Sequence, residues 1–127
     1  MLGIFGIFGR SQEVQRLDDA LRASGVHPRA VSDAIKLTTL KQLKEANGGA
    51  PPDTRLCAAA AELIGYCVLG GRAFAEANDP ERTEAVEARL VAAIDSGRGL
   101  DARIVLLTLH AGVTHASVVE RYGLVAE

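Results

Sequence analysis

One stretch of the chain, residues 55–69, is apolar or small at almost every position. After Arg55 at its start, only Glu62 and the hydroxyl group of Tyr66 interrupt it. A helix that is apolar on all sides has to be covered by other elements. The stretch therefore predicts a central buried helix over about residues 53–69. Asp53 follows two prolines and can cap this helix, and two glycines after Leu69 can end it.

A second stretch, residues 100–111, is nearly as apolar, and the remaining helical segments are amphipathic. Apolar residues at intervals of three and four predict these helices, and Ser11 and Asp79-Pro80 supply clear start signals. The expected helices cover residues 12–24, 28–46, 72–77, 80–96 and 115–122.

The pattern predicts an all-α fold, a compact irregular bundle of about six helices around the two buried ones, about 53–69 and 100–111. No alternation of apolar and polar residues predicts a strand, and no repeat of solenoid length is present. We expect an apolar N-terminal arm, residues 1–10, followed by a single helical domain, residues 11–127. In the core, Leu63, Ile64 and Val68 are expected to pack against Ile104 and Leu107.

Several charged positions are expected at the surface. Asp18 and Arg22 have the i,i+4 spacing of an exposed helical pair. Lys36, Lys41 and Lys44 form a cluster of one sign, which is typical of a solvated helix face. Glu62 is expected to lie on a narrow solvent-facing stripe of the central helix.

The composition argues against nucleic acid and membrane as partners. The 127 residues are 48% hydrophobic and carry a net charge of −2, so the chain offers no basic field to phosphates or anionic lipid. Aromatic residues make up 4% and Trp is absent, which disfavours stacking on single strands. No apolar run is long enough to span a membrane.

The two cysteines, Cys57 and Cys67, both fall on the central helix. Ten residues of helix separate them by about 15 Å, too far for a disulfide. Buried reduced cysteines are typical of a cytoplasmic protein, and the N-terminus lacks the basic region and cleavage site of a secretory signal. We therefore expect a cytoplasmic location.

No pattern of catalytic or metal-binding residues is present. His110 and His115 lie five residues apart across a helix break, which is not the i,i+4 spacing of helical zinc sites. The thiol of Cys57 in an apolar helix would stay protonated, and no serine stands in a nucleophile elbow. The sequence predicts no cofactor, no metal site and no enzymatic activity.

The segment Ala111-Gly112-Val113-Thr114-His115-Ala116-Ser117-Val118 joins the last two helices. It resembles the turn and second helix of the helix-turn-helix in bacterial repressors of the lactose-repressor family, where A-G-V-S-x-x-T-V is typical. The resemblance implies a DNA-binding regulator that uses residues 104–122. Its contacts would come from Thr114, His115, Ser117 and Arg121.

The same segment departs from that family at important positions. Ala116 and Glu120 fall on groove-reading positions, where alanine reads little and glutamate repels phosphate. Arg121 occupies a position that is normally apolar. Leu106 and Leu109 of the preceding helix are expected to be buried. DNA binding is therefore an alternative function and not the preferred one.

The N-terminal arm reads M-L-G-I-F-G-I-F-G-R and cannot form a stable helix because of its glycines. Its large apolar side chains are expected to contribute to an oligomer interface: Leu2, Ile4, Phe5, Ile7 and Phe8. We expect the chain to be a small cytoplasmic helical module that acts through protein–protein contacts. Its partner is expected to be a second copy, in a homodimer, or another protein. The chain could instead be a small-ligand binder or a membrane-surface adaptor.

Overall fold

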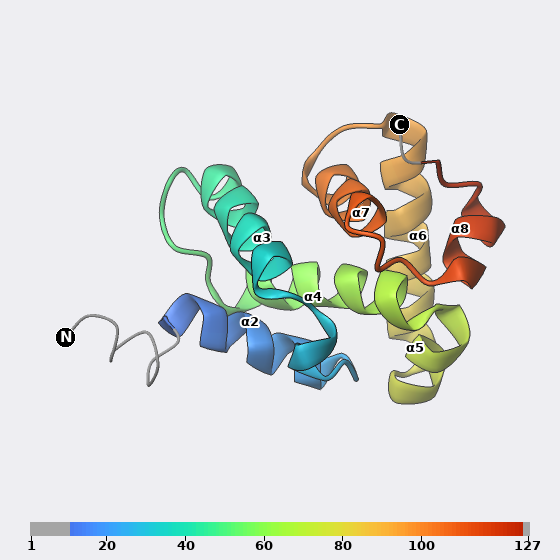
Figure 1. The fold of residues 1–127 in the computed structure, drawn as a ribbon, viewed down its shortest axis with the longest axis horizontal. Coiled ribbons are helices and arrows are strands. Elements are labelled where there is room, and N and C mark those ends of the chain that lie inside the picture. Colours follow the sequence, from blue (N-terminus) through green and yellow to red (C-terminus); the bar gives the residue numbers. More distant parts are fainter. Residues whose placement is uncertain (1–10, 126–127) are drawn as a thin grey trace.

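The computed structural model describes residues 11–125 and contains, over these residues, seven α-helices and one short 3-10 helix with no strand (Figure 1). The prediction of an all-α bundle is confirmed. The N-terminal arm, residues 1–10, with its five large apolar residues, lies outside the described residues. The elements are α2 (Gln12–Ala23), η1 (Pro28–Ala30), α3 (Asp33–Ala46), α4 (Thr54–Leu69), α5 (Gly71–Ala77), α6 (Pro80–Ser96), α7 (Leu100–His110) and α8 (Ala116–Tyr122).

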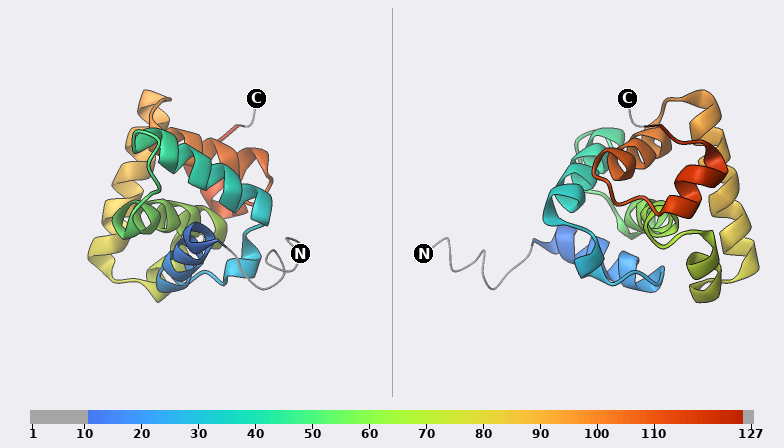
Figure 2. Two further views of the ribbon diagram at one scale, coloured as in Figure 1. Left: turned by 90° about the vertical axis from the view of Figure 1, so that its left-hand side faces the viewer. Right: turned by 45° about the vertical axis from the view of Figure 1, so that its right-hand side comes forward.

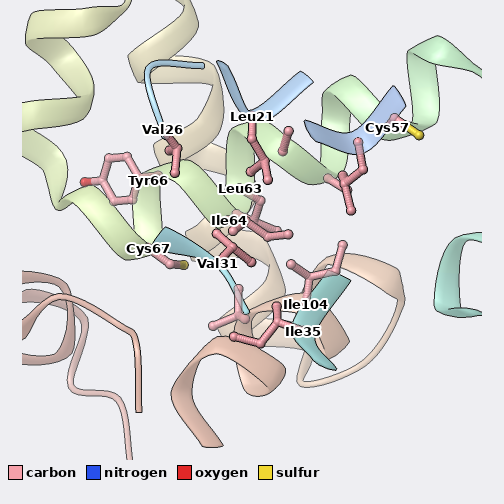
Figure 3. Packing of buried hydrophobic residues seen from close by; sticks show 14 of the residues in the cluster. Leu21, Val26, Val31, Ile35, Cys57, Leu63, Ile64, Tyr66, Cys67 and Ile104 are labelled. Atoms are coloured by element: carbon pink, nitrogen blue, oxygen red, sulfur yellow. The ribbon is translucent and has the colours of Figure 1, made fainter. Parts of the chain in front are cut away.

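Helix α4 is the centre of the fold, as the sequence predicts. It contacts α2, α3, α5, α6 and α7 and runs across the middle of the molecule in Figure 1, and Figure 2 shows it surrounded by other helices when seen nearly end-on. Leu63 and Ile64 are fully buried, between Leu21 of α2 on one side and Ile35 and Ile104 on the other (Figure 3). This core holds the remaining helices around α4.

The predicted helix starts are confirmed by their capping hydrogen bonds. The carboxylate of Asp53 accepts from the backbone N–H of Leu56 at 2.9 Å, and that of Asp79 accepts from Arg82 at 2.7 Å. The hydroxyl of Ser11 accepts from the N–H of Val14 at 3.1 Å. Each bond satisfies an amide that has no partner inside its helix.

The predicted single helix over residues 28–46 is wrong. Pro28 begins only the 3-10 turn η1, and the backbone is extended at Val31 and Ser32. The hydroxyl of Ser32 then caps α3 by accepting from the N–H of Ile35 at 3.3 Å. Ser32 offers the backbone a second start signal, and the break lets Val31 turn into the core.

The expectation that Lys36 and Asp18 lie at the surface is also wrong. Lys36 is only 2% exposed, and its ammonium lies 2.8 Å from a carboxylate oxygen of Asp18. Lys44 of the same predicted cluster pairs with Glu13 of α2 at 3.1 Å, whereas Lys41 is exposed as expected. The two ion pairs join α3 to α2.

Helix α7 is less buried than the sequence predicts. Ile104 is fully buried, but Leu107 and its expected neighbour Val68 are only half-buried. Leu106 is 47% exposed, and Leu109 is half-buried, which corrects the expectation that both are buried. The helices α3, α4 and α6 contact α7 and leave one of its apolar sides open.

Candidate interaction surface

The open side of α7 carries a continuous apolar stripe. Ala102, Val105, Leu106 and Leu109 follow the i, i+3, i+4, i+7 spacing that places residues on one face of a helix. Ile104 beside this stripe and Val105 within it are buried in the core, Ala102 and Leu109 are half-buried, and Leu106 is exposed. The apolar surface of α7 is therefore only partly covered within the described residues.

This stripe forms one wall of a groove of about 390 Å³, here called the α6–α7 groove. Ala93 and Ile94 of α6 and Gly97, which follows that helix, form a second wall, and the segment 123–125 forms the third. The segment reaches this position because Gly123 adopts a left-handed conformation, with φ of 62°, and the N–H of Leu124 bonds to the carbonyl of Val119 at 3.0 Å. Figure 1 shows the chain after α8 turning back toward α6.

The side chains that line the α6–α7 groove are all apolar. All ten lining residues are glycines or have aliphatic side chains, and none can exchange a proton or bind a metal ion. Leu106 and Val125 at its edge are 47% and 68% exposed. Such a surface can bury the apolar side chains of another molecule, and it has no groups for catalysis.

A polar cluster lies on another side of α4. The hydroxyl of Tyr66 donates to the Glu87 carboxylate at 2.7 Å and lies 3.0 Å from the hydroxyl of Tyr122. The guanidinium of Arg121 donates to the same Glu87 oxygen at 2.9 Å and to the Tyr66 hydroxyl at 3.3 Å. Arg72 lines the adjoining pocket of about 290 Å³.

The groups of this cluster satisfy one another. Because the Tyr66 hydroxyl donates its only proton to Glu87, the Tyr122 hydroxyl must donate to Tyr66. Burial, followed by these hydrogen bonds, raises the pKa of Tyr66 above its usual range. The cluster ties α8 to α4 and α6, and we interpret it as structural. The sequence does not predict it, since Tyr66 and Tyr122 are 56 positions apart and no local spacing relates them.

The four residues expected to contact DNA come together beside the C-terminal end of α4. His115 is the N-cap of α8: its Nδ1 accepts from the N–H of Ser117 at 3.1 Å, and its backbone N–H donates to the carbonyl of Cys67 at 2.7 Å. The Thr114 hydroxyl donates to that of Thr108 at 3.1 Å. The Ser117 hydroxyl lies 2.8 Å from the same His115 nitrogen.

Arg121, the basic member of this set, is already engaged. Its guanidinium pairs with Glu87 at 2.9 Å and lies 5.0 Å from the centre of the Tyr122 ring. A phosphate would have to compete with Glu87 for this charge. Helix α8 also carries the exposed Glu120. No contact among the described residues specifically favours DNA binding.

Glu62, predicted to face solvent, is half-buried and shared between two arginines. Its carboxylate oxygens lie 3.3 Å from Arg82 and 3.6 Å from Arg89. Arg89 also makes two hydrogen bonds, at 3.0 and 2.9 Å, to the carboxylate of Asp101. This network joins α4, α6 and α7, and we interpret it as a connection between helices.

Both cysteines are buried and unlinked, as expected. Burial raises the pKa of the Cys57 thiol, and it raises the pKa of the Cys67 thiol to about 11. Over residues 11–125, no three potential ligands gather to hold a metal ion. In the same range, no helix combines the length and apolarity needed to cross a membrane.

Compared with protein-family models, curated proteins and solved structures, the chain matches none of them.

Proposed function

We propose that this chain is a small helical protein-interaction module that functions as a homo-oligomer, with the α6–α7 groove as its contact surface. The observation that carries the proposal is the open apolar stripe of α7, with Leu106 47% exposed at the edge of a groove lined only by glycine and aliphatic residues. Contiguous apolar surface of this kind is typical of interaction sites.

The energetics of the groove are consistent with association. Leu106 is 47% exposed and Leu109 is half-buried, so covering each one contributes at most about half of the roughly 1.5–3 kcal/mol that burying a fully exposed leucine gives. The lining contains no charge that a partner would have to desolvate. A partner with apolar side chains therefore covers no charged group of the groove lining.

The test is the mass of the full chain in solution after a charge is placed in the groove. We expect Leu106→Asp and Leu109→Asp to convert an oligomer to a monomer, because a carboxylate in the contact would be buried without a partner. Sedimentation velocity or light scattering measures the mass, and circular dichroism with a thermal melt verifies the fold. Leu37→Asp, on α3 and 59% exposed, is the matched control and should leave the mass unchanged.

Equal masses for all three variants and the original chain would contradict the groove as contact surface. Loss of the oligomer in Leu37→Asp alone would move the interface to α3. Small-ligand binding, attachment to a membrane surface and DNA binding remain predictions, because no contact or cavity among the described residues favours one of them specifically.

A further inference from the structure

We infer that the α6–α7 groove of one copy receives the N-terminal arm of a second copy. This inference rests on the proposed function and names the occupant of the proposed contact surface. The arm is residues 1–10 and lies outside the described residues. Its sequence supplies five large apolar side chains within seven positions: Leu2, Ile4, Phe5, Ile7 and Phe8.

The arm and the groove have matching chemistry. Arg10 carries the only charged side chain of the arm, and the ten residues of the groove carry none. A volume of about 390 Å³ is at the lower end of the range that holds a small organic ligand, about 300–1,000 Å³. The groove can therefore take one or two of the arm's larger side chains, while the glycines between them allow close approach of the backbone.

The position of α2 favours an arm from a second copy. The Arg16 guanidinium donates to the Pro52 carbonyl at 2.8 Å, so the start of α2 lies beside the start of α4. The other end of α4, at Gly70, lies against His115 and Ser117, next to α8. The 16 residues of α4 span about 24 Å along its axis, from the start of α2 to the residues that precede α8. Figure 1 shows the start of α2 on one side of the molecule and α8, with the segment that follows it, on the other.

The length of the arm limits which surfaces its side chains can reach from the start of α2. Phe8 precedes Ser11 by three residues, so even a fully extended chain carries it no more than about 11 Å from the start of α2. Phe8 can therefore contact only surfaces close to the start of α2, whereas the α6–α7 groove of the same molecule is formed by α6, α7 and the segment 123–125, which lie away from the start of α2 in Figure 1. The groove of a second copy, placed beside α2, is accessible to the whole arm.

Symmetry predicts how many copies assemble. If each copy inserts its arm into the groove of the other across a two-fold axis, both arms and both grooves are covered and growth stops at a dimer. If the insertion runs in one direction only, a free groove and a free arm remain at the ends and the assembly continues into a chain. We therefore expect a dimer with exchanged arms.

The experiment is complementation between two full-length variants that are defective at opposite sides of the contact. One variant carries Phe5→Asp with Phe8→Asp in the arm, and the other carries Leu106→Asp in the groove. Each alone should dimerise about 30-fold or more weakly, the effect of losing one dominant contact side chain. A one-to-one mixture should regain dimers, because the heterodimer has one intact arm facing one intact groove.

The control and the remaining outcomes separate this inference from the proposed function. Leu37→Asp should neither weaken the dimer nor complement either variant. If the arm variant stays dimeric while Leu106→Asp is monomeric, the arm is not the occupant, although the groove is still the contact surface. If both variants are monomeric and the mixture regains nothing, arm exchange between copies is refuted.

Two further outcomes overturn the inference in other directions. An original chain that is monomeric and binds anionic phospholipid vesicles only with an intact arm would assign the arm to a membrane surface. If the unsubstituted chain is monomeric and does not bind vesicles, both the exchange of arms and the proposed homo-oligomer are refuted.

Discussion

At the scale of single residues, the buried pair of Lys36 and Asp18 is the largest departure from the surface pattern. The ammonium and the carboxylate are 2.8 Å apart, and both side chains are less than one-tenth exposed. Removing two charges from water has a high desolvation cost, which a close pair offsets only while both partners are present. The pair therefore makes the α2–α3 contact specific for one arrangement.

Replacing Lys36 alone should destabilise the protein strongly. We expect Lys36→Met to reduce the free energy of unfolding by about 3–5 kcal/mol, because the carboxylate of Asp18 stays buried after it loses the ammonium. The double variant Asp18→Leu with Lys36→Met should recover most of this loss. Urea denaturation measures all three, with Lys41→Met on the same helix as control. A loss below about 0.5 kcal/mol for Lys36→Met would show that the pair is solvated in solution.

At the scale of elements, the apolar side chains of α7 lie in two different environments. Ile104 is fully buried against the core, while Leu106, two positions later, is 47% exposed along the α6–α7 groove. Successive residues on a helix differ by about 100° in direction, so this difference in environment follows from the position of the neighbours and not from residue type.

The two faces of α7 should respond differently to truncation. At a concentration where the chain is monomeric, Ile104→Ala is expected to lower the free energy of unfolding by about 2–5 kcal/mol, since it leaves a cavity in the core. Leu106→Ala should change it by less than about 0.5 kcal/mol, the range of surface positions. Urea denaturation in dilute solution compares them. Similar losses for both would mean that the groove is closed within the monomer.

At the scale of the whole molecule, α4 places weak acids in the core that holds the fold together, and Cys67 and Tyr66 are two of them. Burial raises the pKa of Cys67 to about 11, from 9.0 for an ordinary thiol, and raises that of Tyr66 above its ordinary value of 10.0. Between the unfolded and folded pKa values, the unfolded chain has lost a proton that the folded chain keeps. The folded state binds more protons there, so its stability falls as pH rises.

We therefore expect alkaline destabilisation that begins near pH 9. The contribution of Cys67 is fully present below pH 9 and is lost by about pH 11, an effect of about 2–3 kcal/mol. Tyr66 adds to the loss at pH values above about 10. Urea denaturation from pH 8 to pH 10 measures the slope, and Cys67→Ala should flatten it. Parallel slopes for the variant and the original chain would show that this thiol titrates normally.

The sequence by itself determined the helical class, the central helix and most helix ends. Asp53 and Asp79 cap their helices through bonds to amides three residues away, so the residues that decide these ends are neighbours in the sequence. The all-round apolar pattern of α4 likewise required burial, whatever elements covered it. The break before α3 was missed because Pro28 and Ser32 are both valid start signals, and local spacing does not rank them.

Only the tertiary structure decided which distant side chains meet and which apolar face stays open. In the sequence, Lys36 looks like any solvated lysine, and only the packing of α2 against α3 places Asp18 beside it. Likewise, the hydroxyl groups of Tyr66 and Tyr122 are hydrogen-bonded although the residues are 56 positions apart. The stripe ending at Leu109 predicts that something covers α7, but not whether the cover lies in the same molecule. Side-chain spacing fixes the direction of a face relative to its own helix, whereas its burial depends on how the whole chain packs around it.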